Sequence, residues 1–101
     1  MPSPAIAPLR VGLVDDHEVI AAAVHAALRQ TRELELVASA STVDGLFGRA
    51  AGRLHLVVLD LRLADGSSPA NNVERLVGAG CNVIAFTSGE SPYLLLSLIH
   101  I

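Results

Sequence analysis

Four short apolar runs recur along the chain, and polar or turn-forming residues bound each of them. The runs cover residues 9–14, 34–40, 54–59 and 82–86. Runs of this length that are rich in Val, Ile and Leu are typical of strands, and near-continuous ones are typical of a buried parallel sheet. Segments with helical spacing follow each run. We therefore predict the order βαβαβαβα, in which right-handed crossovers place helices on both faces of one parallel sheet.

The segment after the first run has the spacing of an amphipathic helix. Between residues 17 and 30, Ile20, Val24 and Leu28 recur at i, i+4 and i+8, which places them on one face. Asp16 is expected to cap the start of this helix, because a carboxylate can accept a hydrogen bond from the first free backbone amides.

Similar boundary signals surround the second and third predicted helices. Ser41 or Thr42 is expected to cap the second helix, and Gly52 is expected to close it. Pro69 suits the first turn of the third helix, which Gly80 ends. The inward-facing residues of that helix are predicted to be Val73, Leu76 and Val77.

Polar residues follow three of the four runs at the point where each run ends. Asp15 and Asp16 follow the first, Asp60 follows the third and Thr87 follows the fourth. Functional residues of open α/β sheets gather beyond the carboxyl ends of the strands, so these side chains are predicted to converge. Carboxylates about 4 Å apart repel by about 4 kcal/mol at an effective dielectric of 20, so the cluster calls for a cation, and Mg²⁺ suits it.

Such a site can transfer phosphoryl groups. A carboxylate beside a divalent cation can attack a phosphoryl donor and form an acyl phosphate. A hydroxyl such as that of Thr87 could then hydrogen-bond the bound group. Taken singly, Asp15 or Asp16 would pass for a helix cap and Asp60 for the start of a loop. Their joint placement at one edge of the sheet favours the functional interpretation.

Composition narrows the range of functions further. The 101 residues fit one domain, and a net charge of −3 with seven Arg and no Lys argues against an electrostatic nucleic-acid surface. Cys81 is the single cysteine, which favours a reducing cytoplasm and a buried thiol. His17, His25 and His55 show no paired metal-ligand spacing and are expected at the surface or beside strands. Residues 1–8 lack the features of a signal peptide, and no apolar run is long enough to span a membrane.

Three motifs resemble the receiver domain of bacterial two-component response regulators. The first motif, VGLVDDHEVI at 11–20, resembles the first strand of the family with its acidic pair. The second, VVLDLRLADGSS at 57–68, resembles the phosphoacceptor strand and the loop after it. The third, VIAFTS at 83–88, resembles the fourth strand with its switch hydroxyl. The resemblance covers residues 9–95. It implies a flavodoxin-like, doubly wound parallel sheet. The residues of the first two motifs are most similar to those of one branch of the family, in which the receiver precedes a helix-turn-helix DNA-binding domain.

The resemblance also implies roles for individual residues. Asp60 would accept a phosphoryl group from a sensor histidine kinase, Thr87 would move toward that group, and Ser88 would take the small-residue position beside it. DNA would be contacted only through an output domain that this chain does not include, and the full-length protein could form a homodimer. The metal site that the resemblance implies is a Mg²⁺ site of Asp15, Asp16, Asp60 and the backbone carbonyl of Arg62.

The sequence departs from this family in two respects. The family places a Lys and an aromatic residue on a fifth strand, whereas this chain has no Lys, and Tyr93 does not stand in the aromatic position. We therefore expect a receiver truncated after the fourth strand and the start of a fourth helix near Ser91. The expected organisation is a disordered lead-in at 1–8, a partial receiver at 9–95 and a non-native tail at 96–101, whose sequence matches a translated sequencing adapter.

The leading hypothesis is a cytoplasmic phosphoacceptor module that is not an enzyme. One alternative is a receiver-like interaction module that is never phosphorylated, which the missing Lys favours for the chain as it stands. A less favoured alternative is a Mg²⁺-dependent phosphohydrolase with an aspartyl nucleophile. That class favours Asp-x-Asp after the first strand, which neither residues 15–17 nor 60–62 supply. Dinucleotide binding is disfavoured because no Gly-rich turn follows the first strand.

Overall fold

A computed structural model describes residues 7–87, which form four strands and three helices. The strands lie in the order β2-β1-β3-β4, and every neighbouring pair is parallel. This arrangement confirms the predicted flavodoxin-like α/β sheet, whose first strand lies between the second and the third. The elements in chain order are β1 (Leu9–Val14), α1 (Glu18–Leu28), β2 (Leu34–Ala40), α2 (Val43–Arg49), β3 (Leu56–Asp60), α3 (Pro69–Gly78) and β4 (Asn82–Phe86).

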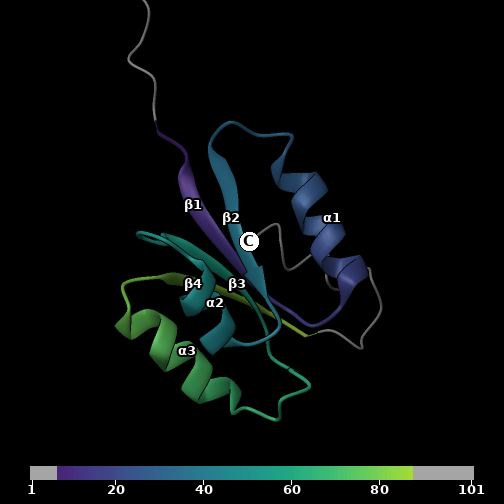
Figure 1. Ribbon diagram of the computed structural model, residues 1–101, viewed down its shortest axis with the longest axis vertical. Coiled ribbons are helices and arrows are strands. Elements are labelled where there is room, and N and C mark those ends of the chain that lie inside the picture. The colour runs from purple at the N-terminus through teal and green to yellow at the C-terminus, as the bar shows by residue number, and fades with distance from the viewer. Residues whose placement is uncertain (1–6, 88–101) are drawn as a thin grey trace, which may run out of the picture.

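The helices cover both faces of the sheet. α1 lies on one side, and α2 and α3 lie on the other (Figure 1). Successive residues of a strand point to opposite faces, so β3 contributes to two cores. Val58 packs on the α1 side with Phe86, whereas Val57 and Leu59 pack with Leu46 and other residues on the α2–α3 side. Burial on both faces explains why the two central strands, β1 and β3, read as continuous apolar runs.

Gly12 shows how closely the α2 layer approaches the sheet. A Cβ at this position would lie 3.1 Å from both terminal methyl groups of Leu46 and 3.2 Å from one methyl of Leu54. Cys81 lies in the same α2–α3 core, where burial raises the pKa of its thiol. The prediction of a buried thiol is therefore confirmed.

Capping residues define the helix boundaries. The Thr42 hydroxyl accepts a hydrogen bond from the amide of Gly45 at 2.9 Å, which identifies Thr42, and not Ser41, as the cap of α2. α3 begins at Pro69, as predicted. It ends in a Schellman motif, because Gly80 has a φ of 88° and the amide of Cys81 bonds to a carbonyl of the last turn at 3.0 Å.

Three details of the predicted helices are wrong. α1 spans Glu18–Leu28 and is shorter than residues 17–30. Gly52 does not close α2, because the helix ends at Arg49, and Gly52 lies in the following loop with a φ of 82°. Val77 is 56% exposed, because Asn72 and Leu76, one turn apart, form the buried stripe of α3. Val73 and Leu76 do pack inward, as predicted.

Several predictions concern parts of the chain outside the described residues. These are residues 1–6 of the lead-in, Ser88, the helix start near Ser91, the aromatic Tyr93 and the tail at 96–101. Within residues 7–87, no helix is long and apolar enough to cross a membrane.

Candidate functional site

The three predicted carboxylates converge at one end of the sheet. Asp15 and Asp16 follow β1, and Asp60 is the last residue of the neighbouring strand β3, which pairs with β1 up to Leu59. Asp15, Asp16, Asp60 and His17 each offer one ligand atom, and these four atoms all lie within 4.8 Å of one another. We call these four residues the acidic cluster. The convergence predicted from the strand ends is therefore present in the structure.

Thr87 and Arg62 lie at the same end of the sheet. Thr87 follows Phe86, which pairs with Asp60, and the Phe86 carbonyl accepts a hydrogen bond from the amide of Leu61 at 2.8 Å. The amide of Arg62 donates to Asp60 Oδ1 at 2.9 Å, so the backbone after β3 orients the Asp60 carboxylate. The predicted roles of the Thr87 hydroxyl and the Arg62 carbonyl stay predictions.

Asp15 is a buried carboxylate whose environment disfavours its negative charge. Its side chain has no exposed surface, and Oδ1 accepts a hydrogen bond from the amide of His17 at 3.1 Å. Oδ2 is buried and has no hydrogen-bond partner within the described part of the chain. Burial raises the pKa of Asp15, and the nearby Asp60 carboxylate raises it further, whereas the hydrogen bonds from His17 oppose the rise. A charged Asp15 therefore needs a positive partner.

Asp16 binds the loop after β3 and does not cap α1. Its Oδ2 accepts a hydrogen bond from the amide of Ala64 at 2.6 Å, which ties the end of β1 to the loop after β3. The prediction that Asp16 caps α1 is wrong, since the N-cap is His17, which makes no side-chain capping bond. The Asp16 carboxylate therefore bonds to the backbone of the β3–α3 loop and not to the first free amides of α1.

His17 is the member of the cluster that sequence reasoning missed. Its Nδ1 lies 2.8 Å from Asp15 Oδ1, 3.0 Å from Asp16 Oδ1 and 3.7 Å from Asp60 Oδ2. The hydrogen bond to Asp15 raises the pKa of His17, and the charges of the three carboxylates add to the effect. The only sequence signal was its place directly after the acidic pair, because it has no second histidine at metal-ligand spacing.

The residues of the cluster fit a divalent cation. Carboxylate oxygens are the ligands that Mg²⁺ prefers, and three of them meet here. The buried Oδ2 of Asp15 has no protein partner among the described residues, and this leaves it able to bind an ion. Asp15, Asp16 and Asp60 are therefore the residues that would hold Mg²⁺.

The acidic cluster makes the stability of the metal-free protein depend on pH. Because the pKa of His17 is raised above its ordinary value of 6.5, its favourable contribution is complete below that pH and is lost as the pH rises through the folded-state pKa. The raised pKa of Asp15 acts in the same direction at lower pH. We expect the free energy of unfolding, measured with urea in EDTA, to fall as the pH rises above 6.5. His17→Gln should flatten this slope, and an unchanged slope would contradict the assignment.

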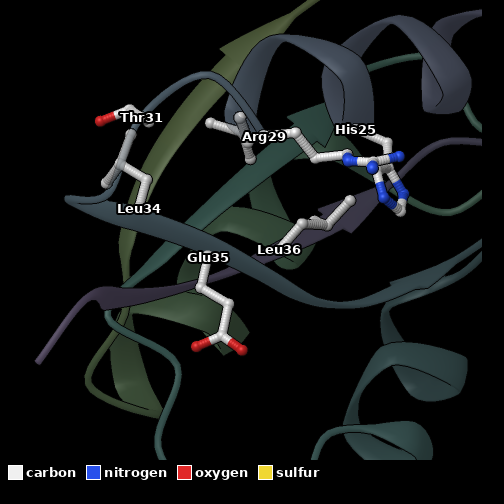
Figure 2. Close-up of a pocket in the computed structure, with 7 residues that line it drawn as sticks. His25, Arg29, Thr31, Leu34, Glu35 and Leu36 are labelled. Carbon is white, nitrogen blue, oxygen red and sulfur yellow. The ribbon is translucent and has the colours of Figure 1, made fainter.

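Two hollows on the surface differ in whether residues of the acidic cluster line them. One lies at the acidic cluster and is lined by residues 15–18, Ala21, residues 39–41 and Arg49. Another lies between the end of α1 and β2 (Figure 2). In Figure 2, Glu35 points away from His25 and Arg29. The second hollow shares no residue with the acidic cluster, whereas Asp15, Asp16 and His17 of the cluster line the first.

Solved structures similar to this chain are response regulators. No protein-family model matches the chain, and no curated protein is significantly similar to it. The receiver (REC) domain of PhyR from Erythrobacter litoralis is 25% identical over 79% of this chain, with a TM-score of 0.64. A mutant of the response regulator MaeR bound to sulfate is 20% identical over 94% of the chain, with a TM-score of 0.66. PhyR from Brucella abortus is 23% identical over 91% of the chain, with a TM-score of 0.60.

The chain covers these proteins to different extents. It spans 63% of the E. litoralis PhyR domain, 80% of the MaeR chain and 46% of B. abortus PhyR. The likeness to MaeR and to B. abortus PhyR, at 20% and 23% identity, concerns the fold alone. The strand order β2-β1-β3-β4 and the structural likeness to the PhyR domain agree with the motifs. The chain fits the receiver domain of response regulators.

Proposed function

We propose that this chain is a phosphoacceptor module of two-component signalling and that Asp60 receives the phosphoryl group. The observation that carries the proposal is the acidic cluster, in which Asp60 ends β3 directly beside the acidic pair that follows β1. A carboxylate in this position is both oriented and close to the groups that would hold a divalent cation. Carboxylate nucleophiles that form acyl phosphates need these two conditions.

The proposed donor is a phosphohistidine of a sensor histidine kinase. An oxygen of Asp60 attacks the phosphorus, a P–O bond forms, the P–N bond breaks, and the leaving imidazole nitrogen takes up a proton. Bound Mg²⁺ would neutralise charge on the transferring group. The hydrogen bond from the amide of Arg62 to Oδ1 holds the carboxylate in one orientation during the attack.

Asp15, Asp16 and Thr87 support the proposed reaction from the neighbouring strand ends. The two carboxylates would hold the cation with Asp60, and the backbone carbonyl of Arg62 would supply a further oxygen. The Thr87 hydroxyl would hydrogen-bond the phosphoryl group on Asp60, since Thr87 follows the residue that pairs with Asp60. That contact would transmit the state of Asp60 to β4.

The wider setting is proposed from the family resemblance. The module would act in the cytoplasm, receive its phosphoryl group from the kinase and control a DNA-binding output domain, with a homodimer as the full-length assembly. It would act as a signalling module and not as an enzyme with turnover. The likeness to solved response regulators supports this class of protein.

Labelling with a small phosphodonor tests the acceptor. With acetyl phosphate and Mg²⁺, the protein should gain one phosphoryl group that is stable in acid and labile in base, measured by intact mass. Asp60→Asn should abolish this gain, because the amide has no nucleophilic oxygen yet can still accept the hydrogen bond from Arg62. Asp65→Asn, an exposed aspartate in the same loop, should label like the wild type. Labelling of Asp60→Asn at the wild-type level would place the acceptor elsewhere.

A further inference from the structure

The acidic cluster contains an imidazole nitrogen as well as carboxylate oxygens. Nδ1 of His17 lies 2.8, 3.0 and 3.7 Å from one oxygen each of Asp15, Asp16 and Asp60. With metal–ligand bonds of about 2.1 Å, neighbouring donors lie about 3.0 Å apart around an octahedral ion and about 3.4 Å apart around a tetrahedral one. The nitrogen therefore has the spacing of a fourth ligand.

Three further observations suit the cluster to an ion with His17 among its ligands. Asp15 contributes a buried oxygen that has no hydrogen-bond partner among residues 7–87, so none of these residues satisfies this potential ligand atom. The His17 side chain is 49% exposed, so its ring can adjust to an ion without disturbing a packed core. His17 also makes no side-chain capping bond, so ligation would not cost α1 a capping interaction.

We propose that His17 makes this a mixed imidazole–carboxylate site that prefers borderline transition-metal ions, such as Co²⁺ and Zn²⁺, over Mg²⁺. Mg²⁺ favours oxygen ligands and keeps several waters, so it gains little from an imidazole. Borderline ions bind imidazole well, and their affinity for a given nitrogen and oxygen donor set rises from Mn²⁺ toward Cu²⁺. The inference shares with the proposed function only the premise that the cluster binds a divalent cation.

Calorimetric titration with Co²⁺ and with Mg²⁺, at one fixed pH, tests the proposal. The wild type should bind Co²⁺ at least about tenfold more tightly than Mg²⁺. His17→Ala should lose most of that preference through weaker Co²⁺ binding while its Mg²⁺ affinity stays close to that of the wild type. His25→Ala, which removes an exposed histidine from α1 outside the cluster, should match the wild type for both ions.

The visible absorption of bound Co²⁺ supplies a second readout. Loss of a nitrogen ligand should shift the d–d bands in His17→Ala and leave them unchanged in His25→Ala. An unchanged ratio of Co²⁺ to Mg²⁺ affinity in His17→Ala would overturn the inference and reduce His17 to a hydrogen-bond donor, with the Mg²⁺ site intact. Binding of Co²⁺ through His17 without any Mg²⁺ binding would uphold the inference and remove Mg²⁺ from the proposed function. Failure of the folded wild type to bind either ion would overturn both.

Discussion

Asp15→Asn is expected to abolish the stabilisation of the protein by Mg²⁺ and, at the same time, to stabilise the metal-free protein. In the wild type, a ligand that binds only the folded state raises the free energy of unfolding by RT ln(1 + [L]/Kd). The variant removes a carboxylate ligand whose side chain has no exposed surface, so millimolar Mg²⁺ should leave its melting temperature unchanged. Both effects follow from removal of the negative charge of Asp15, which would bind the ion and is costly to bury without it.

The gain in the metal-free protein follows from the environment of Asp15. Its Oδ2 is buried and no residue between 7 and 87 bonds to it, and burial raises the pKa of this carboxyl, so charging it destabilises the fold. Asparagine carries no charge and can still accept the hydrogen bond from the amide of His17. We expect a gain of about 1–3 kcal/mol in EDTA at neutral pH, because the variant removes a negative charge that is costly to bury.

Thermal and urea denaturation with and without Mg²⁺ measure both effects. Glu35→Gln is the control, because it removes one negative charge from an exposed position on β2 outside the cluster. It should keep the Mg²⁺ response of the wild type. A Mg²⁺-induced rise in the melting temperature of Asp15→Asn equal to that of the wild type would show that the ion does not bind through this carboxylate.

Phe86→Ala is expected to destabilise the protein by about 3–5 kcal/mol, the usual cost of truncating a buried aromatic residue. Phe86 is 1% exposed and is the largest fully buried side chain among the described residues. It packs beneath α1 with Val11, Leu13 and Val58 from the sheet and Val24 from the helix. Since domains are stable by only about 5–15 kcal/mol, this change should remove a large part of the total.

Urea denaturation followed by circular dichroism measures this loss. Val19→Ala is the control on the same layer, because Val19 lies on α1 with 82% of its surface exposed, and it should change stability by less than about 0.5 kcal/mol. Phe86→Leu should recover much of the loss, since it keeps most of the apolar volume. Equal midpoints for Phe86→Ala and Val19→Ala would contradict the packing of the α1 layer.

The pattern of apolar residues was enough to predict the sheet and the edge that carries the site. The central strand β1 begins and ends at the predicted residues, because a strand that is buried on both faces leaves a continuous apolar run bounded by polar ones. The positions of Asp15, Asp16 and Asp60 followed from those boundaries, since the carboxyl ends of neighbouring parallel strands meet at one edge. These are local signals combined with a general rule of topology.

Helix faces and side-chain partners needed the tertiary structure. Val77 is exposed although its type suits a core, because the rotation of α3 is set by the contacts of Leu76 and Asn72 with the rest of the molecule. Asp16 accepts a hydrogen bond from Ala64, which lies 48 residues away, instead of capping the helix beside it. The sequence shows which hydrogen-bond donors lie near a carboxylate along the chain. The fold decides which donor lies close enough in space to form the bond.

His17 shows the same division within the site itself. Its sequence neighbours indicated only that it follows an acidic pair, and a single histidine without a partner at metal-ligand spacing is typical of a surface residue. The fold brings Asp60 from a strand more than 40 residues away to within 3.7 Å of its Nδ1, and the hydrogen bond with Asp15 holds the ring over the cluster. The sequence by itself determined the sheet and which carboxylates meet. Only the tertiary structure decided which of them is buried without a partner and that an imidazole lies among them, because both depend on contacts between separate strand ends.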